Sequence, residues 1–239
     1  MMKNLILIFC AVFYANAYAQ SIPVTLGNKQ VIIEYHSGKA PMYVHLHENE
    51  TTALTAIKKT VASEHNAWLS LHHGGTRTIT FYLHNQRFEF DPNRIFTPRG
   101  IRLSLERYSH YSKDAAAEVD KLAVKIKDLI ADKAVIAVHN NRGYSLEDYL
   151  PGHSLSHDAK RIHFPQKPAY RNFFLVTRSD DYCALKDKGV NVIEQHKHAE
   201  DDGSLSVYMA DKAYVNVEAG YGQLAAQTKM LDAAQKLLG

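Results

Sequence analysis

Apolar residues along the chain alternate between the spacing typical of strands and the spacing typical of helices. Short strand-like runs occur at residues 30–35, 42–47, 77–83, 87–90, 134–138, 173–176, 190–193 and 214–217. Helical spacing occurs at residues 50–63, 114–132 and 223–238. This alternation predicts an α/β fold, with a mixed, mostly parallel central sheet flanked by helices on both faces. We find no linker or internal repeat, so residues 20–239 are expected to form one domain.

The N-terminal residues have the pattern of a secretory signal peptide. Lys3 precedes an apolar run at residues 5–14, and a small-x-small cleavage site ends at Ala19. The run is too short to span a membrane, and the alternative is a membrane-associated N-terminal helix. We expect residues 1–19 to be removed and the mature protein to be exported, to the periplasm or out of the cell, without a stable membrane anchor.

The composition narrows the chemistry that the mature chain can use. Of its 239 residues, 46% are apolar and 22% are charged, and the formal net charge is +3. No stripe of Lys and Arg is present, so we expect no nucleic-acid partner. The two cysteines are Cys10, within the signal segment, and Cys183, so the mature chain cannot form an intramolecular disulfide. A metal site would therefore use histidines and carboxylates.

Four ligating or acidic residues come directly at or after the ends of predicted strands. His47 ends one strand, Glu50 lies one helical turn further, and His139 and Glu218 each come after an apolar strand. Ligands gather outside the carboxyl ends of strands in α/β sheets, so these residues can converge. Two histidines and a glutamate are a ligand set of catalytic zinc, which keeps a fourth position for water. Glu218 would then accept the proton of that water.

The order and context of these residues resemble the zinc carboxypeptidases of the pancreatic carboxypeptidase superfamily, the funnelins. The resemblance extends from His47 to Glu218 and includes residues 91–94, with the sequence DPNR where the family has Asp-x-Asn-Arg. It implies one zinc ion bound by His47, Glu50 and His139, and Glu218 acting as general base. Because the chain is shorter than typical peptidase members, it could also be nearer the succinylglutamate desuccinylase and aspartoacylase branch.

The same resemblance implies roles for polar residues that would contact substrate. Asn93 and Arg94 would bind a substrate carboxylate, since a guanidinium donates two parallel hydrogen bonds to such a group. The alternative for Arg94 is an ion pair with Asp91. Arg77 is the candidate for holding the oxyanion that develops on the scissile carbonyl. Two other arginines compete for that role, Arg99 and Arg142.

A tyrosine that closes over the substrate is also implied by the resemblance. We assign it to Tyr208, and three other tyrosines compete for it, Tyr144, Tyr149 and Tyr221. His45 is not expected to bind the metal, because it alternates with His47 on one strand and should face the opposite side.

These features predict an exported zinc-dependent hydrolase that cleaves an amide bond next to a free carboxylate, in a peptide or a peptidoglycan stem peptide. The nearest alternative is an N-acyl amino acid deacylase or amidase. The alternative from another class is a non-catalytic protein that binds zinc or a peptide terminus. The sequence leaves the oligomeric state open.

Overall fold

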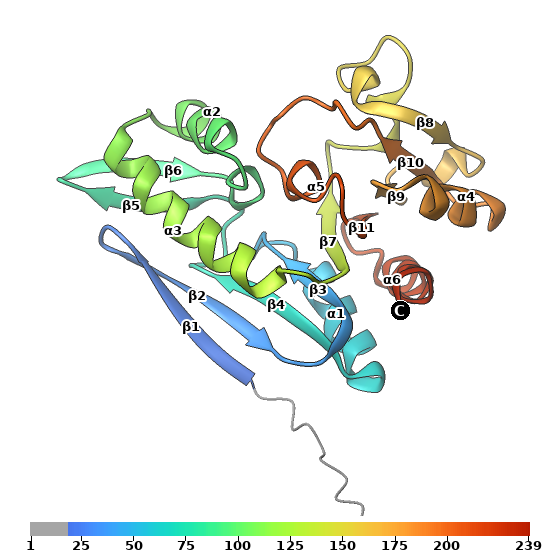
Figure 1. The fold of residues 1–239 in the computed structure, drawn as a ribbon, viewed down its shortest axis with the longest axis horizontal. Helices are drawn as coiled ribbons and strands as arrows, with labels where there is room; N and C mark the ends of the chain where they lie inside the picture. The colour runs from blue at the N-terminus through green and yellow to red at the C-terminus, as the bar shows by residue number, and fades with distance from the viewer. Residues whose placement is uncertain (1–18) are drawn as a thin grey trace, which may run out of the picture.

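A nine-stranded mixed sheet is the centre of the structure, a computed structural model that describes residues 19–239 (Figure 1). The strand order is β1-β2-β4-β3-β7-β11-β9-β10-β8. The strands are β1 (Ala19–Leu26), β2 (Lys29–His36), β3 (Lys39–His45), β4 (Asn66–His72), β7 (Val135–Asn141), β8 (Ala159–His163), β9 (Phe173–Val176), β10 (Val192–Gln195) and β11 (Tyr214–Gly220). Except for Ala19, the predicted signal peptide lies outside the described residues.

The sheet confirms the predicted α/β class and its mixed character, but the prediction of a mostly parallel sheet is wrong. Four pairings between neighbouring strands are parallel and four are antiparallel. Short connections explain part of the difference. β1 and β2 are joined by a two-residue turn at Gly27 and Asn28, which allows only an antiparallel pair, because a parallel pair needs a long crossover. The parallel strands β4, β3, β7 and β11 remain together in the middle.

Helices cover both faces of the sheet, as predicted. One face carries α1 (Thr51–Glu64), α4 (Ser179–Asp187) and α6 (Leu224–Leu238). The other carries α2 (Pro98–Tyr108), α3 (Lys113–Ile130), α5 (Leu205–Tyr208) and the hairpin of β5 (Ile79–Leu83) and β6 (Gln86–Phe90). None of the helices in residues 19–239 is long and apolar enough to cross a membrane.

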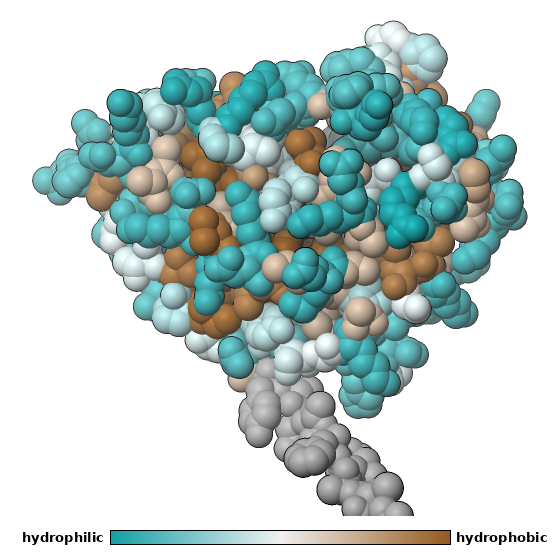
Figure 2. All heavy atoms as spheres, viewed as in Figure 1, coloured by the Kyte–Doolittle hydropathy of each residue, from teal (hydrophilic) through white to brown (hydrophobic). Residues whose placement is uncertain are grey.

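Alternating side chains on the central strands divide the interior into two hydrophobic cores. In β3, Met42 and Val44 join the core beneath α3, while Tyr43 joins the core beneath α1 and α6. The central strands are buried on both faces, which explains why their sequences are continuous apolar runs. In Figure 2, hydrophilic residues cover most of the visible face, and apolar residues reach it only in separate patches.

Several elements differ from the sequence prediction. Helix α3 begins at Lys113, one residue before the predicted range, and its cap is Ser112, whose side chain accepts a hydrogen bond from the Ala115 amide. The segment from 143 to 170, where the sequence predicts no strand or helix, contains β8 and three 3-10 turns, Leu146–Tyr149, Ser156–Asp158 and Lys167–Ala169. The sequence prediction also missed β1, β4, α2, α4 and the short α5.

Two of the missed elements lack the local signals on which such predictions depend. β4 comes directly after a helix without a turn of Gly or Pro, and its Ser70 and His72 interrupt the apolar pattern. α2 begins with Pro98 and Gly100, which are more common in loops, although a proline fits the first turn of a helix. Tertiary packing therefore decides both elements.

Two glycines form a close backbone crossing between the loop before α5 and the start of α2. Gly203 has a φ of +77°, and a Cβ on it would lie 2.4 Å from the Gly100 Cα and 2.7 Å from the Arg94 carbonyl oxygen. The Gly203 carbonyl also accepts a hydrogen bond from the Phe96 amide, at 2.9 Å. The crossing therefore fixes the two segments against each other, and no side chain fits between them.

Replacing Gly203 with alanine should destabilise the fold more than the same change at Gly189. Gly189 has a φ of +65°, but nothing lies within 4 Å of the position that a Cβ would occupy, so Gly189→Ala should cost only about 1 kcal/mol for the left-handed backbone. Gly203→Ala adds a backbone clash, typically another 1–3 kcal/mol, about the cost of overpacking. Urea unfolding of both variants measures the difference. Equal losses at both positions would contradict the crossing.

Candidate metal centre

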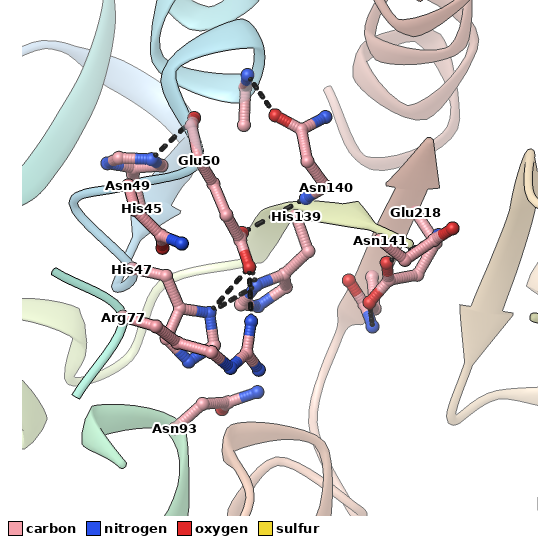
Figure 3. A network of polar contacts seen from close by, with 12 residues as sticks. His45, His47, Asn49, Glu50, Arg77, Asn93, His139, Asn140, Asn141 and Glu218 are labelled. Atoms are coloured by element: carbon pink, nitrogen blue, oxygen red, sulfur yellow. Dashed lines mark hydrogen bonds and ion pairs between the residues drawn. The ribbon is translucent and has the colours of Figure 1, made fainter. Parts of the chain in front are cut away.

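The three expected ligands, His47, Glu50 and His139, come together at one edge of the sheet (Figure 3). β3 and β7 are parallel neighbours, with Val44 opposite Ala137, so the end of β3 lies beside the end of β7. His47 and Glu50 come after β3, in the turn before α1. His139 differs from the prediction in one respect, because it lies within β7 instead of after it.

The three side chains are buried and their ligand atoms are close together. His47 is 0% exposed, Glu50 1% and His139 2%. His47 Nδ1 lies 2.9 Å from Glu50 Oε1 and 3.2 Å from His139 Nδ1, which is 3.0 Å from Glu50 Oε2. Ligands bound at about 2.0–2.1 Å to a tetrahedral ion lie about 3.3 Å from one another, close to these separations. The group therefore fits a metal ion, since two imidazole nitrogens and a carboxylate converge on one point.

Asp91 holds His47 in the orientation that this geometry requires. The Nε2–H of His47 donates to Asp91 Oδ1 at 2.7 Å, because a carboxylate can only accept. This bond places the proton on Nε2 and leaves Nδ1 with a lone pair toward Glu50 and His139. Carboxylates that orient a histidine ligand in this way are common around metal sites. The sequence prediction did not assign this role to Asp91.

Electrostatics in the metal-free protein favour a protonated His47. Burial alone would lower its pKa, but the carboxylates of Glu50 and Asp91 outweigh burial and raise the pKa to about 9. Burial has the opposite effect on Glu50 and would raise its pKa, but His47 and His139 hold that pKa well below its usual value. A proton on His47 thus supplies the positive charge that a metal ion would otherwise bring.

His45 is not one of the converging residues, in agreement with the sequence prediction, but its hydrogen bonds hold the turn that carries Glu50. Its Nε2–H donates to the Glu50 carbonyl oxygen at 3.1 Å, and its Nδ1 lies 2.9 Å from the Ser70 hydroxyl. Burial lowers the pKa of His45 to about 4, so its ring is neutral near pH 7. His45 therefore ties the turn that carries Glu50 to β4.

Asn140, in the neighbouring strand β7, holds the same turn through hydrogen bonds. Its amide N–H donates to Glu50 Oε2 at 3.0 Å, and its side-chain oxygen accepts from the Ala53 amide at 2.7 Å. Helix α1 has no cap from its own N-cap side chain, so Asn140 satisfies one of its free amides. Its Nδ2 donates to Gln227 in α6, at 2.8 Å. Nothing local in the sequence indicates this role, because it depends on three elements meeting.

A cavity of about 770 Å³ opens from the three ligands and contains most of the other candidate residues. Its lining includes the predicted base and substrate-binding groups, Glu218, Arg77, Asn93 and Arg94. The lining also includes Arg142 and three tyrosines, Tyr144, Tyr149 and Tyr221. The three candidate ligands His47, Glu50 and His139, named here the metal group, therefore line the same cavity as these side chains.

Two candidates lie away from that cavity. Tyr208 is not in its lining and packs on Phe96, with ring centroids 6.0 Å apart, and under the ammonium of Lys212 at 4.8 Å. Arg99 is also outside the lining and pairs on the surface with Glu200 at 2.8 Å. Arg142 lines the cavity with its guanidinium 4.4 Å from the Tyr221 ring.

Glu218 lies in β11 directly opposite His139 in β7, and both side chains reach the cavity. Its two carboxylate oxygens accept hydrogen bonds from the amides of Asn141 at 3.0 Å and Asn216 at 3.3 Å. Burial raises the pKa of Glu218, and the negative charge of Glu50 adds to the shift, against the opposing effect of His139. Glu218 is thus a carboxylate whose proton affinity is higher than usual.

Arginines border the metal group on its open side. Arg77 donates to Glu50 Oε1 at 2.7 Å and lies 3.4 Å from Asp91 Oδ2, with its side chain about half exposed. It lies in a loop before β5 and not at a strand start. Arg94 pairs with Asp202, at 3.4 Å, whereas Asp91 is taken by His47 and Arg77. The alternative of a direct Arg94–Asp91 ion pair is therefore not what the structure contains.

Comparison with models of protein families finds no match to this chain, and a search of curated proteins also finds none. Its function must accordingly be inferred from the residues and their geometry.

Replacing Asp91 with asparagine should weaken metal binding about 10–100-fold, as is typical when the group that orients a histidine ligand is lost. Asp202→Asn is the matched control, because Asp202 lines the cavity without touching a ligand, and it should leave metal affinity unchanged. Competition with a chelator, using Zn²⁺ at about pH 9, measures both variants where protons compete least for His47. Equal affinities of Asp91→Asn and the wild type would contradict the role of Asp91.

Metal binding should release about one proton per ion near pH 7.5. Since the pKa of His47 is raised from 6.5 to about 9, the stabilisation from its protonation is complete below pH 6.5 and is lost as the pH rises through 9. A metal must displace that proton, so apparent Zn²⁺ affinity should rise about tenfold per pH unit between about pH 6.5 and 8.5. Calorimetry in buffers of different ionisation enthalpy counts the protons. An affinity that does not vary with pH would show that His47 is already neutral.

Proposed function

We propose that the protein is an exported zinc hydrolase that cleaves an amide bond next to a free carboxylate, as a carboxypeptidase-like domain acting on a peptide. One observation carries the proposal: the buried His47-Glu50-His139 group opens into a cavity that also holds a buried carboxylate, Glu218, and a half-buried arginine, Arg94. A metal-binding protein without a reaction would not need a second carboxylate of raised pKa beside the metal group.

Zinc is the metal that suits this ligand set best. Two imidazoles and one carboxylate in a buried, tetrahedral arrangement are typical of catalytic zinc, whereas magnesium and calcium prefer sites made of oxygen ligands alone. The three residues leave a side open toward the cavity. A zinc ion bound there would polarise a carbonyl group and lower the pKa of a water molecule to about 7.

Glu218 is the proposed general base. Its raised pKa suits a carboxylate that takes a proton from the attacking water and then gives it to the leaving amine. Asn141 and Asn216 hold its carboxylate through one amide N–H each, so its position in the cavity is fixed before substrate arrives. The base therefore needs little reorganisation during the reaction.

Arg94 and Asn93 are the proposed carboxylate site, and Arg77 the proposed oxyanion site. Arg94 lies half-buried in the cavity wall and keeps its charge, because Asp202 and Asp91 outweigh the effect of desolvation and raise its pKa. A substrate carboxylate would compete with Asp202 for this guanidinium. Arg77 lies beside Glu50 and can turn from it toward a carbonyl oxygen, because its side chain is about half exposed.

Glu218→Gln should retain zinc and lose at least about 10³-fold in turnover, because the amide cannot accept the proton. The assay follows zinc-loaded protein with two sets of substrates, N-benzoylglycyl amino acids for release of a C-terminal residue and N-acetyl amino acids for deacylation. Faster cleavage of the first set supports the peptidase proposal, and faster cleavage of the second supports an N-acyl amino acid deacylase.

Asp202→Asn controls for a general disturbance of the cavity, because it changes a carboxylate that is not proposed to transfer a proton. It should alter KM more than kcat. Turnover of Glu218→Gln at the wild-type rate would contradict the proposed base, and a protein that takes up no zinc would contradict both hydrolase proposals.

A further inference from the structure

Three asparagines in the cavity lining have buried amide oxygens without a partner, Asn49, Asn141 and Asn216, and the last two both contact Glu218. Asn141 is 5% exposed and Asn216 is 7% exposed, and both line the cavity. The Oδ1 atoms of both are buried, and neither has a hydrogen-bond partner among the described residues. Buried acceptors without a partner are unfavourable, so the two beside Glu218 point to a ligand that brings donors.

The orientation of both amides is set by their neighbours. Asn141 Nδ2 donates to Glu218 Oε2 at 3.0 Å and to the Arg171 carbonyl oxygen at 2.9 Å. Asn216 Nδ2 donates to Glu218 Oε1 at 3.3 Å. The Arg171 carbonyl and the ionised Glu218 carboxylate can only accept, so turning either amide over would set oxygen against oxygen when Glu218 is ionised, as the proposed base must be. The unpartnered atoms are therefore the oxygens, and they can only accept.

Strand register places both oxygens on either side of the proposed base. In β11, residues 216 and 218 point to the same face, and in β7 residues 139 and 141 do so. Glu218 is opposite His139, and Asn216 is opposite Ala137, further from the metal group. The two unpartnered oxygens thus flank Glu218, and Asn216 lies beside Leu175 of β9, which also lines the cavity.

We propose that Asn141 and Asn216 form the specificity pocket of the hydrolase and bind a primary amine on the residue that carries the free carboxylate. An ammonium suits them best, because it has three donors and no acceptor. A carboxamide or hydroxyl would bring an acceptor as well, and a carboxylate would bring only acceptors. Glu218 between the two amides, together with Asp202, provides negative charge for a cation.

This inference rests on the proposed function, since the carboxylate of the same residue would be held by Arg94. The substrate class is therefore a peptide or acyl derivative that ends in a diamino acid, in which carboxylate and side-chain amine are separated by a short aliphatic chain. Leu175 in the cavity lining can contact that chain.

Binding of small carboxylates to the zinc-loaded wild-type protein tests the pocket without requiring turnover. The probes are 6-aminohexanoate, its four- and five-carbon homologues, and hexanoate, which has the same chain without the amine. Calorimetry should show that at least one amino compound binds about tenfold or more tightly than hexanoate, as charge-assisted hydrogen bonds would provide. Equal affinities for all amino compounds and hexanoate would overturn the proposal.

Asn216→Leu should reduce that preference to about threefold or less, because the amine loses an acceptor, and should leave hexanoate binding within about threefold of the wild type, because hexanoate has no donor for Asn216. Asn28→Leu makes the same exchange in the turn between β1 and β2 and should keep the preference. An amine preference that persists in both Asn216→Leu and Asn141→Leu would place the amine elsewhere and overturn the assignment.

The binding measurement gives its result whether or not the protein hydrolyses amides, so the pocket and the reaction can fail separately. An amine preference in a protein that cleaves none of the amide substrates would support the pocket and remove the proposed reaction. Cleavage of amides without an amine preference would support the reaction and remove the pocket.

Discussion

Two imidazole nitrogens and a carboxylate lie about 3 Å from one another in a largely buried site and need a shared positive charge. The rest of the site depends on supplying that charge. Without a metal, a proton on His47 fills that need, which explains why its pKa is raised to about 9 in spite of burial. With a metal, the proton leaves. The surrounding residues keep the three ligand atoms close in either case: Asp91 holds His47, and Asn140 holds Glu50.

The sheet makes that convergence possible over a long separation in sequence. β3, β7 and β11 are parallel neighbours, so Glu50, His139 and Glu218 reach one edge from three chain segments. The connections between these strands supply α1 and α3, which cover opposite faces and bury both sides of the central strands. Both faces of β7 are buried, so burial alone would tolerate a shift of one residue. Such a shift would turn His139 to the other face, so burial by itself does not fix the register. The observed register is the one in which Asn140 accepts from the Ala53 amide and Asn141 donates to Glu218.

Much of this arrangement could be predicted, because a buried strand and an amphipathic helix leave a periodic signal and the ligands stand at the ends of such strands. β9 and the helices α1, α3 and α6 appear in the sequence within about two residues of their ends. The contacts that complete the site depend on loops without periodicity. The loop before α5 brings Asp202 to Arg94, and its position depends on the crossing of Gly203 and Gly100, which lie far apart in sequence. The same loop leads into α5, which holds Tyr208 away from the cavity, and tyrosines from other segments line it instead.

The amides of Asn141 and Asn216 connect the position of the base with the choice of substrate. The N–H groups that hold Glu218 also turn both amide oxygens away from it, so one pair of side chains places an acceptor for protons beside acceptors for an amine. Burial raises the pKa of Glu218, which favours its protonated form. An ammonium bound beside it would lower that pKa, because a nearby positive charge favours the carboxylate. A substrate of the proposed class would therefore favour the ionised form of the base, which the reaction needs, whereas an uncharged side chain of equal length would not.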